Sequence, residues 1–199
     1  SYIDDEGHTP EAVTMPSAPQ CLTLGSPLSL DTIIPTKNGY KTMKNIEIND
    51  YVFDIFNKPV KVLGKSNVKI SNKMYKMKLV DNLGNTLTIK SDDIHKFPCL
   101  NNGVCQLLKM ENIFHLYNIY SIKIFDSNGP IWSIENISLI DNENVQCILV
   151  DSKSHLFLVT DEINNKWYGG DSYPYKACGT SNTGGGKSIW VDQIVEIKS

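Results

Sequence analysis

Arginine is absent from the sequence, so all 19 of its cationic side chains are lysines. Such a bias is typical of an AT-rich genome and indicates no particular fold. An excess of positive charge is also lacking, because the net charge is −3, which disfavours a surface built to bind nucleic acid or anionic membranes. Long apolar runs and a secretory leader are missing as well. We therefore expect a cytoplasmic protein that binds neither nucleic acid nor membrane.

Cysteine occurs five times, at irregular spacings and without any C-x-x-C motif. An odd number of cysteines without a framework of pairs indicates a reducing compartment and free thiols rather than disulfides. Cys99 and Cys105 flank a loop at Asn101-Asn102-Gly103, but no second pair completes a metal site. We therefore expect no bound metal and thiols that are free for chemistry.

Helical periodicity is also scarce, and alternation of apolar and polar residues takes its place. The content of 41% hydrophobic and 21% charged residues suits an ordinary globular chain with one core plus flanks. Turn residues at 37–39 and at 81–85 separate short alternating runs, which predicts an all-β fold. Only 106–116 is compatible with a short helix. The alternating runs are 28–34, 40–48, 51–54, 59–64, 74–80, 86–90, 117–125, 131–140, 145–150 and 155–160.

A phosphate-binding motif is present in two separated halves. Residues 21–26 read Cys-Leu-Thr-Leu-Gly-Ser, and residues 183–188 read Thr-Gly-Gly-Gly-Lys-Ser. The second half fails G-x-x-x-x-G-K-[ST] alone, because Ser181 stands where the first glycine is needed. Joining the halves gives Gly-Ser-Thr-Gly-Gly-Gly-Lys-Ser, a complete P-loop after an apolar, strand-like run. Once joined, the residues that would hold the phosphates and Mg²⁺ of ATP are Gly25, Gly186, Lys187 and Ser188.

Residues 27–182 therefore have the character of an insertion, and three stretches inside it support this interpretation. The first, 28–52, contains Leu-Ser-Leu-Asp-Thr and later Asn-Asp-Tyr-Val. The second, 91–95, reads Ser-Asp-Asp-Ile-His, and the third, 145–158, contains Val-Gln-Cys-Ile-Leu-Val-Asp and His-Leu-Phe-Leu. The insertion ends in asparagine and is followed by threonine. Together these features resemble a mini-intein, a self-excising domain with the all-β horseshoe of the Hint fold. The resemblance implies a host flank at 1–26, a mini-intein at 27–182 and a second host flank at 183–199.

The upstream junction departs from the commonest intein pattern. Inteins usually begin with Cys or Ser, whereas this insertion begins with Pro27, whose side chain has no nucleophile. The resemblance is therefore to class 3 inteins, in which an internal cysteine of the third stretch attacks the upstream bond directly. Cys147 occupies that position and would attack the carbonyl of Ser26 as a thiolate. His95 would polarise the same amide and protonate the departing Pro27 nitrogen. The alternative reading is that Cys147 is an inert thiol buried in an apolar strand.

The downstream junction matches the class 3 pattern. Its first flanking residue is characteristically threonine, so Thr183 would receive the acyl group from Cys147 as an ester. Asn182 would then cyclise to a succinimide, and an O-to-N shift would leave the two flanks joined. Asp151 or His155 would assist this second half. The resemblance implies no cofactor for splicing, a monomer that acts on its own flanks, and ATP and Mg²⁺ only for the spliced host protein.

Three positions differ from the family pattern. Phe97 stands two residues after the histidine, where class 3 inteins carry tryptophan. Asp92 stands three residues before the histidine, where threonine is usual; a one-residue bulge would let Ser91 serve instead. Ser181 replaces the usual histidine before the terminal asparagine. These differences motivate an alternative hypothesis, a degenerate intein that only cleaves or is inactive.

Two further alternatives remain open. Cys21 could be the first intein residue, although that choice destroys the P-loop and leaves the Leu-Ser-Leu-Asp-Thr stretch six residues late. More remotely, the chain could be a non-enzymatic β-rich binding module, which would explain neither the order of the motifs nor the P-loop halves. If the P-loop hypothesis is right, the host is a phage or bacterial ATPase, and 189–199 suits the helix that follows its P-loop.

Overall fold

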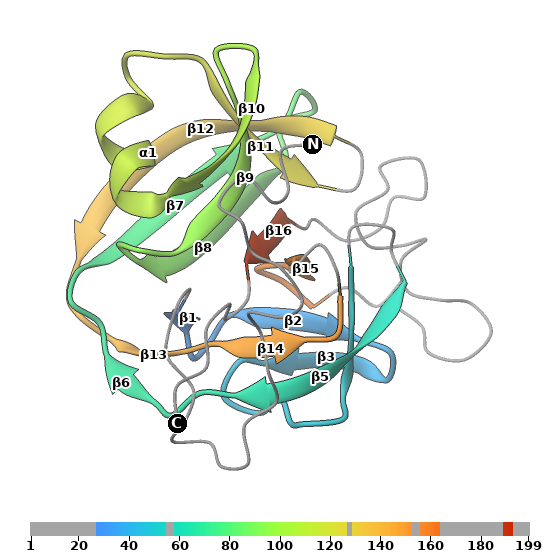
Figure 1. Ribbon diagram of the computed structural model, residues 1–199. Coiled ribbons are helices and arrows are strands. Elements are labelled where there is room, and N and C mark those ends of the chain that lie inside the picture. The colour runs from blue at the N-terminus through green and yellow to red at the C-terminus, as the bar shows by residue number, and fades with distance from the viewer. Residues whose placement is uncertain (1–26, 55–57, 127–128, 153–155, 164–188, 193–199) are drawn as a thin grey trace.

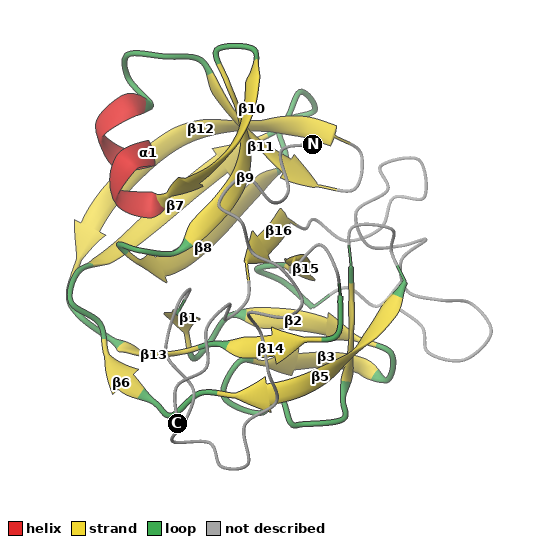
Figure 2. Ribbon diagram, in the orientation of Figure 1, coloured by secondary structure: helices red, strands yellow, loops and turns green. Residues whose placement is uncertain are grey.

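The computed structural model describes residues 27–54, 58–126, 129–152, 156–163 and 189–192, and the described chain is almost entirely β (Figure 1, Figure 2). This confirms the all-β prediction. Its largest unit is an antiparallel sheet of nine strands, in which segments distant in sequence are neighbours. In spatial order the strands are β10 (Val104–Lys109), β9 (Lys96–Asn101), β11 (Ile122–Asp126), β12 (Gly129–Ile140), β7 (Met74–Val80), β8 (Thr86–Asp92), β1 (Leu28–Ser29), β13 (Asn144–Gln146) and β6 (Lys69–Ile70).

Three smaller sheets complete the described chain. Figure 1 shows the long strands of the large sheet in the upper half of the molecule and the first two of the smaller sheets in the lower half, with β13 passing toward β14. The smaller sheets are β14 (Ile148–Val150) with β5 (Pro59–Lys65) and β4 (Tyr51–Phe53), β2 (Ile33–Thr36) with β3 (Gly39–Thr42), and β15 (Leu156–Val159) with β16 (Ile189–Asp192).

Both predicted turns are confirmed. The β2–β3 hairpin closes at Lys37 and Asn38, and Gly39 follows with φ of +113°, a value that side chains with a Cβ rarely adopt. The β7–β8 turn is closed by Asp81, whose carboxylate accepts the N–H groups of Leu83 (2.9 Å) and Asn85 (2.8 Å). Local turn chemistry was therefore a sound guide to these hairpins.

One hairpin was missed. The segment interpreted as a loop between Cys99 and Cys105 is the turn of the β9–β10 hairpin, with positive φ at Asn102 (51°) and Gly103 (87°). Such a pair of left-handed residues matches the twist of the flanking strands. The strand was hidden because β9 buries Phe97, Pro98 and Cys99 in succession, so alternation is lost.

Other predictions need correction as well: the run 28–34 is divided between β1 and β2, and in 40–48 the strand β3 ends at Thr42. The short helix exists as α1 (Met110–Leu116), but 106–109 belong to β10, and in 117–125 the strand β11 begins only at Ile122. The run 145–150 is two strands, interrupted at Cys147. The helix expected at 189–199 is wrong for 189–192, which form β16 against β15. Ile, Trp and Val favour strands, and the apolar strand Leu156–Val159 offers a partner.

The inner faces of the sheets enclose one apolar core. α1 covers it with buried Met110 and Ile113, and Phe114 lies 5.0 Å from the Tyr75 ring, centroid to centroid. With seven residues, α1 cannot cross a membrane, and no other described helix is long and apolar enough to do so. The largest fully buried side chains include Trp132, Phe53, Phe97, Phe157, Leu28 and Ile34.

Candidate active site

Strand β1 brings three distant parts of the chain together. Leu28 pairs with Ser91 of β8 on one side and with Gln146 of β13 on the other. Pro27, just before this strand, is buried, and its carbonyl oxygen accepts the N–H of Asp92 at 3.3 Å. In the antiparallel register with β13, Pro27 stands level with Cys147. The start of the predicted insertion therefore lies between the second and third sequence motifs.

His95 follows β8 in a short turn that ties it to the same region. Its N–H donates to the Asp92 carbonyl oxygen at 3.4 Å, and its own carbonyl accepts the N–H of Met110 at 2.8 Å. The imidazole is completely buried, and its centroid lies 4.6 Å from that of the Phe97 ring at an angle of 57°. Phe97 therefore contacts the histidine directly, but its side chain carries no N–H that it could donate.

Cys147 lies at a junction between sheets. β13 before it belongs to the nine-stranded sheet, and β14 after it belongs to the three-stranded sheet. The thiol residue is fully buried. Its N–H donates to Oγ of Ser66 at 3.0 Å, and its carbonyl accepts the Ser66 N–H at 2.9 Å. The backbone at Cys147 is thus held by hydrogen bonds although the strand is interrupted there.

Asp92 is a buried carboxyl beside Pro27. It is 1% exposed; burial and a hydrogen bond to Asp93 raise its pKa to about 6. Backbone N–H groups of Ile94 (3.2 Å) and Asn72 (3.3 Å) bond to the two carboxyl oxygens and oppose part of that rise. Asp92 therefore releases its proton at a higher pH than an ordinary aspartate does.

The bulge expected to bring Ser91 into the threonine position is not found in β8. The β7–β8 pairing is regular from Val80–Thr86 to Met74–Asp92, without a register shift. The Ser91 hydroxyl is buried and donates to the carbonyl oxygen of Asp92 at 3.0 Å. The Ser91 side chain therefore forms a hydrogen bond with the backbone of the segment that leads to His95.

A charged cluster supports the other side of β1. Lys90 Nζ lies 2.9 Å from Asp31 Oδ2 and 3.0 Å from Glu143 Oε1. The buried Ser29 hydroxyl lies 2.9 Å from the same Glu143 oxygen. Burial lowers the pKa of Lys90, but hydrogen bonds to the two carboxylates outweigh this and raise it. No local sequence pattern marks this cluster, because Glu143 and Asp31 lie 53 and 59 residues from Lys90 along the chain.

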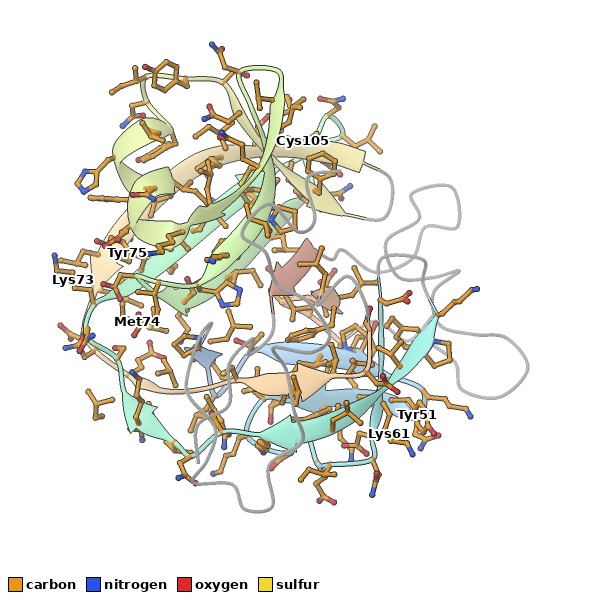
Figure 3. All side chains as sticks on the ribbon, in the orientation of Figure 1. Tyr51, Lys61, Lys73, Met74, Tyr75 and Cys105 are labelled. Atoms are coloured by element: carbon orange, nitrogen blue, oxygen red, sulfur yellow. The ribbon has the colours of Figure 1, made fainter. Side chains whose placement is uncertain are left out.

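Asp151 lies away from Pro27 and Asp92. It is exposed and directly follows β14, whereas Cys147 directly precedes that strand. The Asp151 N–H donates to the carbonyl of Lys61 at 2.9 Å. Figure 3 shows Lys61 at the lower right of the molecule, whereas Met74, the partner of Asp92, lies at the left. Other predicted site residues lie outside the described residues: Gly25, Ser26, His155, Ser181, Asn182, Thr183, Gly186, Lys187 and Ser188.

Cys99 and Cys105 do not form a pair. Cys99 is opposite Gln106 in the β9–β10 hairpin, so the side chain of Cys105 lies on the other face. Cys99 is buried, and burial raises the pKa of its thiol. Cys105, which is labelled in Figure 3, is exposed. Among the described residues no cluster of three His, Cys, Asp or Glu side chains could hold a metal ion.

The sequence matches no protein-family model and no curated protein. Solved structures, however, are similar in fold. The MchDnaB-1 intein is 23% identical, with a TM-score of 0.53 over 67% of this chain and 93% of that one. The gp41-1 intein is 22% identical, with a TM-score of 0.55 over 70% and 97%. A bacterial intein-like domain from Clostridium thermocellum is 18% identical, with a TM-score of 0.53 over 69% and 95%. The chain described here therefore has the Hint fold of inteins.

Proposed function

We propose that residues 27–182 excise themselves and join Ser26 to Thr183 by protein splicing. The observation that carries this proposal is the position of β1, which pairs with both β8 and β13 and so lies between the segments of His95 and Cys147. Those two segments carry the acid and the nucleophile that cleavage at Pro27 requires. The intein fold of the chain supports the same conclusion.

The first step is acyl transfer to sulfur. The Cys147 thiolate attacks the Ser26 carbonyl carbon, forming a C–S bond as the C–N bond to Pro27 breaks, and the proton that the thiol has lost is balanced by the one that the departing nitrogen gains. His95 supplies the proton that the departing nitrogen needs. The Asp92 N–H, bonded to the Pro27 carbonyl, holds the leaving residue in the sheet. Holding the reactants in this way can supply roughly 7–11 kcal/mol of the barrier.

The second half joins the flanks. The Thr183 hydroxyl attacks the thioester, which regenerates the Cys147 thiol and leaves Ser26 on the threonine oxygen. Asn182 then attacks its own carbonyl through its side-chain amide, forming a succinimide and releasing the intein. The free Thr183 amine takes the acyl group from its oxygen, so an ordinary peptide bond results. The product carries the Gly-Ser-Thr-Gly-Gly-Gly-Lys-Ser P-loop of an ATP-binding host protein. The assisting roles of Asp151 and His155 remain predictions.

A cleavage-only intein is the second candidate, and the contact between Phe97 and His95 favours it. A tryptophan there would offer an N–H that phenylalanine lacks, so the aromatic partner of His95 can pack but cannot donate a hydrogen bond. In that case the upstream step would be impaired, and cyclisation of Asn182 would cleave the chain before Thr183 without ligation.

The test is intact mass analysis of the freshly expressed 22.3 kDa chain beside Cys147→Ala and Asn182→Ala. Splicing predicts a 27–182 fragment and a ligated flank peptide, both absent from the two variants. Cys99→Ala is the matched control, since Cys99 is equally buried and should leave splicing intact. Splicing that survives Cys147→Ala would refute the class 3 route, and fragments without ligation would favour the cleavage-only intein.

A further inference from the structure

Two paired segments, 65–69 and 145–148, pass side by side from the large sheet to the three-stranded sheet. On the large-sheet side Val145 pairs with Lys69, and on the other side Ile148 pairs with Lys65. The register changes by one residue between these pairs, so the regular ladder is interrupted where Cys147 faces Ser66. An interrupted ladder cannot by itself hold a residue in place.

Side chains replace the ladder at this point. The Ser66 N–H donates to the Cys147 carbonyl at 2.9 Å, as in a regular antiparallel pair. The Cys147 N–H, however, donates to the Ser66 hydroxyl oxygen at 3.0 Å instead of the Ser66 carbonyl. That carbonyl accepts the side-chain amide of Gln146 at 2.6 Å. Ser66 and Gln146 are 3% and 7% exposed, so water does not compete strongly for these groups.

On the opposite side from β6, β13 pairs with β1, which begins directly after Pro27 at the upstream junction. Gln146 pairs through its backbone with Leu28, the residue after Pro27. We propose that Ser66 is a positioning residue that fixes the Cys147 backbone against Pro27, and that Gln146 holds Ser66 in turn. The inference rests on the proposed function of Cys147 as nucleophile. A displacement of about 1 Å in such an arrangement can cost about a hundredfold in rate.

Ser71 provides a matched control at the other end of the same strand pair. Its N–H donates to the carbonyl of Glu143 at 2.9 Å, and its hydroxyl oxygen accepts the Glu143 N–H at 3.2 Å. It is also 3% exposed. Ser66 and Ser71 therefore make the same two bonds to β13 and its flanks, but only Ser66 makes them to Cys147. A general loss of stability should appear in both alanine variants.

The experiment uses the full chain with Asn182→Ala, which blocks release of the downstream flank. Dithiothreitol then cleaves the thioester at Ser26, and its rate is followed by gel and mass analysis between pH 6 and 9. We expect Ser66→Ala to slow this cleavage by roughly 10–100-fold. Ser66→Thr keeps the hydroxyl and should restore at least a third of the parent rate, and Ser71→Ala should change the rate less than threefold.

A second measurement does not depend on cleavage. Hydrogen exchange of the peptide 145–149 should rise in Ser66→Ala and stay near the parent value in Ser71→Ala, with unfolding midpoints of both variants recorded. Equal slowing in the two alanine variants, or unchanged cleavage in Ser66→Ala despite faster exchange, overturns the positioning role. Unchanged cleavage in Cys147→Ala refutes the proposed function instead, so the two failures are distinguishable.

Discussion

The two strands that flank β1 hold their site residues in different ways. β8 is seven residues long and pairs with β7 in one continuous register, so Asp92 at its end is placed by the ladder itself. β13 has three residues and ends at Gln146, and the next residue, Cys147, makes its backbone hydrogen bonds with Ser66. The end of β8 that leads to His95 is therefore placed by regular sheet pairing, whereas the segment at Cys147 is held by hydrogen bonds that involve side chains.

The largest expected effect on the rate concerns His95, the proposed acid. His95→Gln keeps the shape and a hydrogen-bonding end but removes the imidazole, so upstream cleavage should slow by about 10²–10⁴-fold. The rate is measured by dithiothreitol cleavage of the Asn182→Ala precursor. His115→Gln is the control, since His115 is exposed on α1 and should leave the rate unchanged. Equal rates for His95→Gln and the parent would remove His95 from the mechanism.

The shared strand is tested by Leu28→Ala. Leu28 is fully buried between β8 and β13, so the lost contacts and the cavity should lower the free energy of unfolding by about 2–5 kcal/mol. Urea denaturation measures the loss. Leu139→Ala, at a position 58% exposed, should change it by less than about 0.5 kcal/mol. A small effect at Leu28 would mean that β1 is not packed as the core strand described here.

The buried carboxyl of β8 should leave a signature in the pH dependence of stability. The pKa of Asp92 is raised from 3.8 to about 6 in the fold, so the folded protein binds more protons than the unfolded chain between about pH 4 and pH 6. This group's contribution to stability therefore falls as the pH rises through that window. Asp92→Asn should remove the fall and be more stable than the parent above pH 6.5.

The contribution of Asp81 to stability should change with pH in the opposite direction, so Asp81→Asn serves as the control. Burial raises its pKa, but hydrogen bonds from Asn85 and Leu83 outweigh this, and the net pKa is lowered. Its contribution is present above about pH 4 and is lost as the pH falls. Asp81→Asn should therefore reduce stability at neutral pH and flatten the acid side of the profile. Parallel profiles for Asp92→Asn and the parent would contradict the environment described for Asp92.

The smallest effect is expected from the charged cluster beside β1. Lys90 bridges Asp31 and Glu143, but its side chain is 25% exposed, so Lys90→Met should cost about 1 kcal/mol or less and less still in 1 M salt. Lys78→Met, from a pair that is about half exposed on each side, should cost nothing measurable. Thermal unfolding at low and high salt would check both. A larger loss at Lys78 would contradict this ranking.

Several elements could be predicted because their causes are local. The β2–β3 and β7–β8 hairpins follow from turn residues between alternating runs, and both are confirmed. The β9–β10 hairpin escaped because three consecutive residues of β9 are buried, which erases the period of two. The continuous strand expected through Cys147 was wrong, since nothing local shows that the chain changes sheets there.

The candidate site was only partly predictable for a similar reason. His95 and Cys147 could be predicted as site residues from their motifs. Gln146 is a polar residue in an apolar run, but its role was not predicted from the sequence. Ser66 carried no signal, because its bond to Cys147 joins residues 81 positions apart. The contact of Pro27 with Asp92 is likewise a consequence of sheet order.

Taken alone, the sequence determined the β character of the chain, its two clearest hairpins and the order of its motifs, since these depend on backbone preferences and side-chain periods within a few residues. Only the tertiary structure decided that β1 lies between β8 and β13, that the strand is interrupted at Cys147 beside Ser66, and that Asp92 is buried. Strand order and burial arise from pairing between distant segments, and their energies depend on neighbours that no local window of sequence contains.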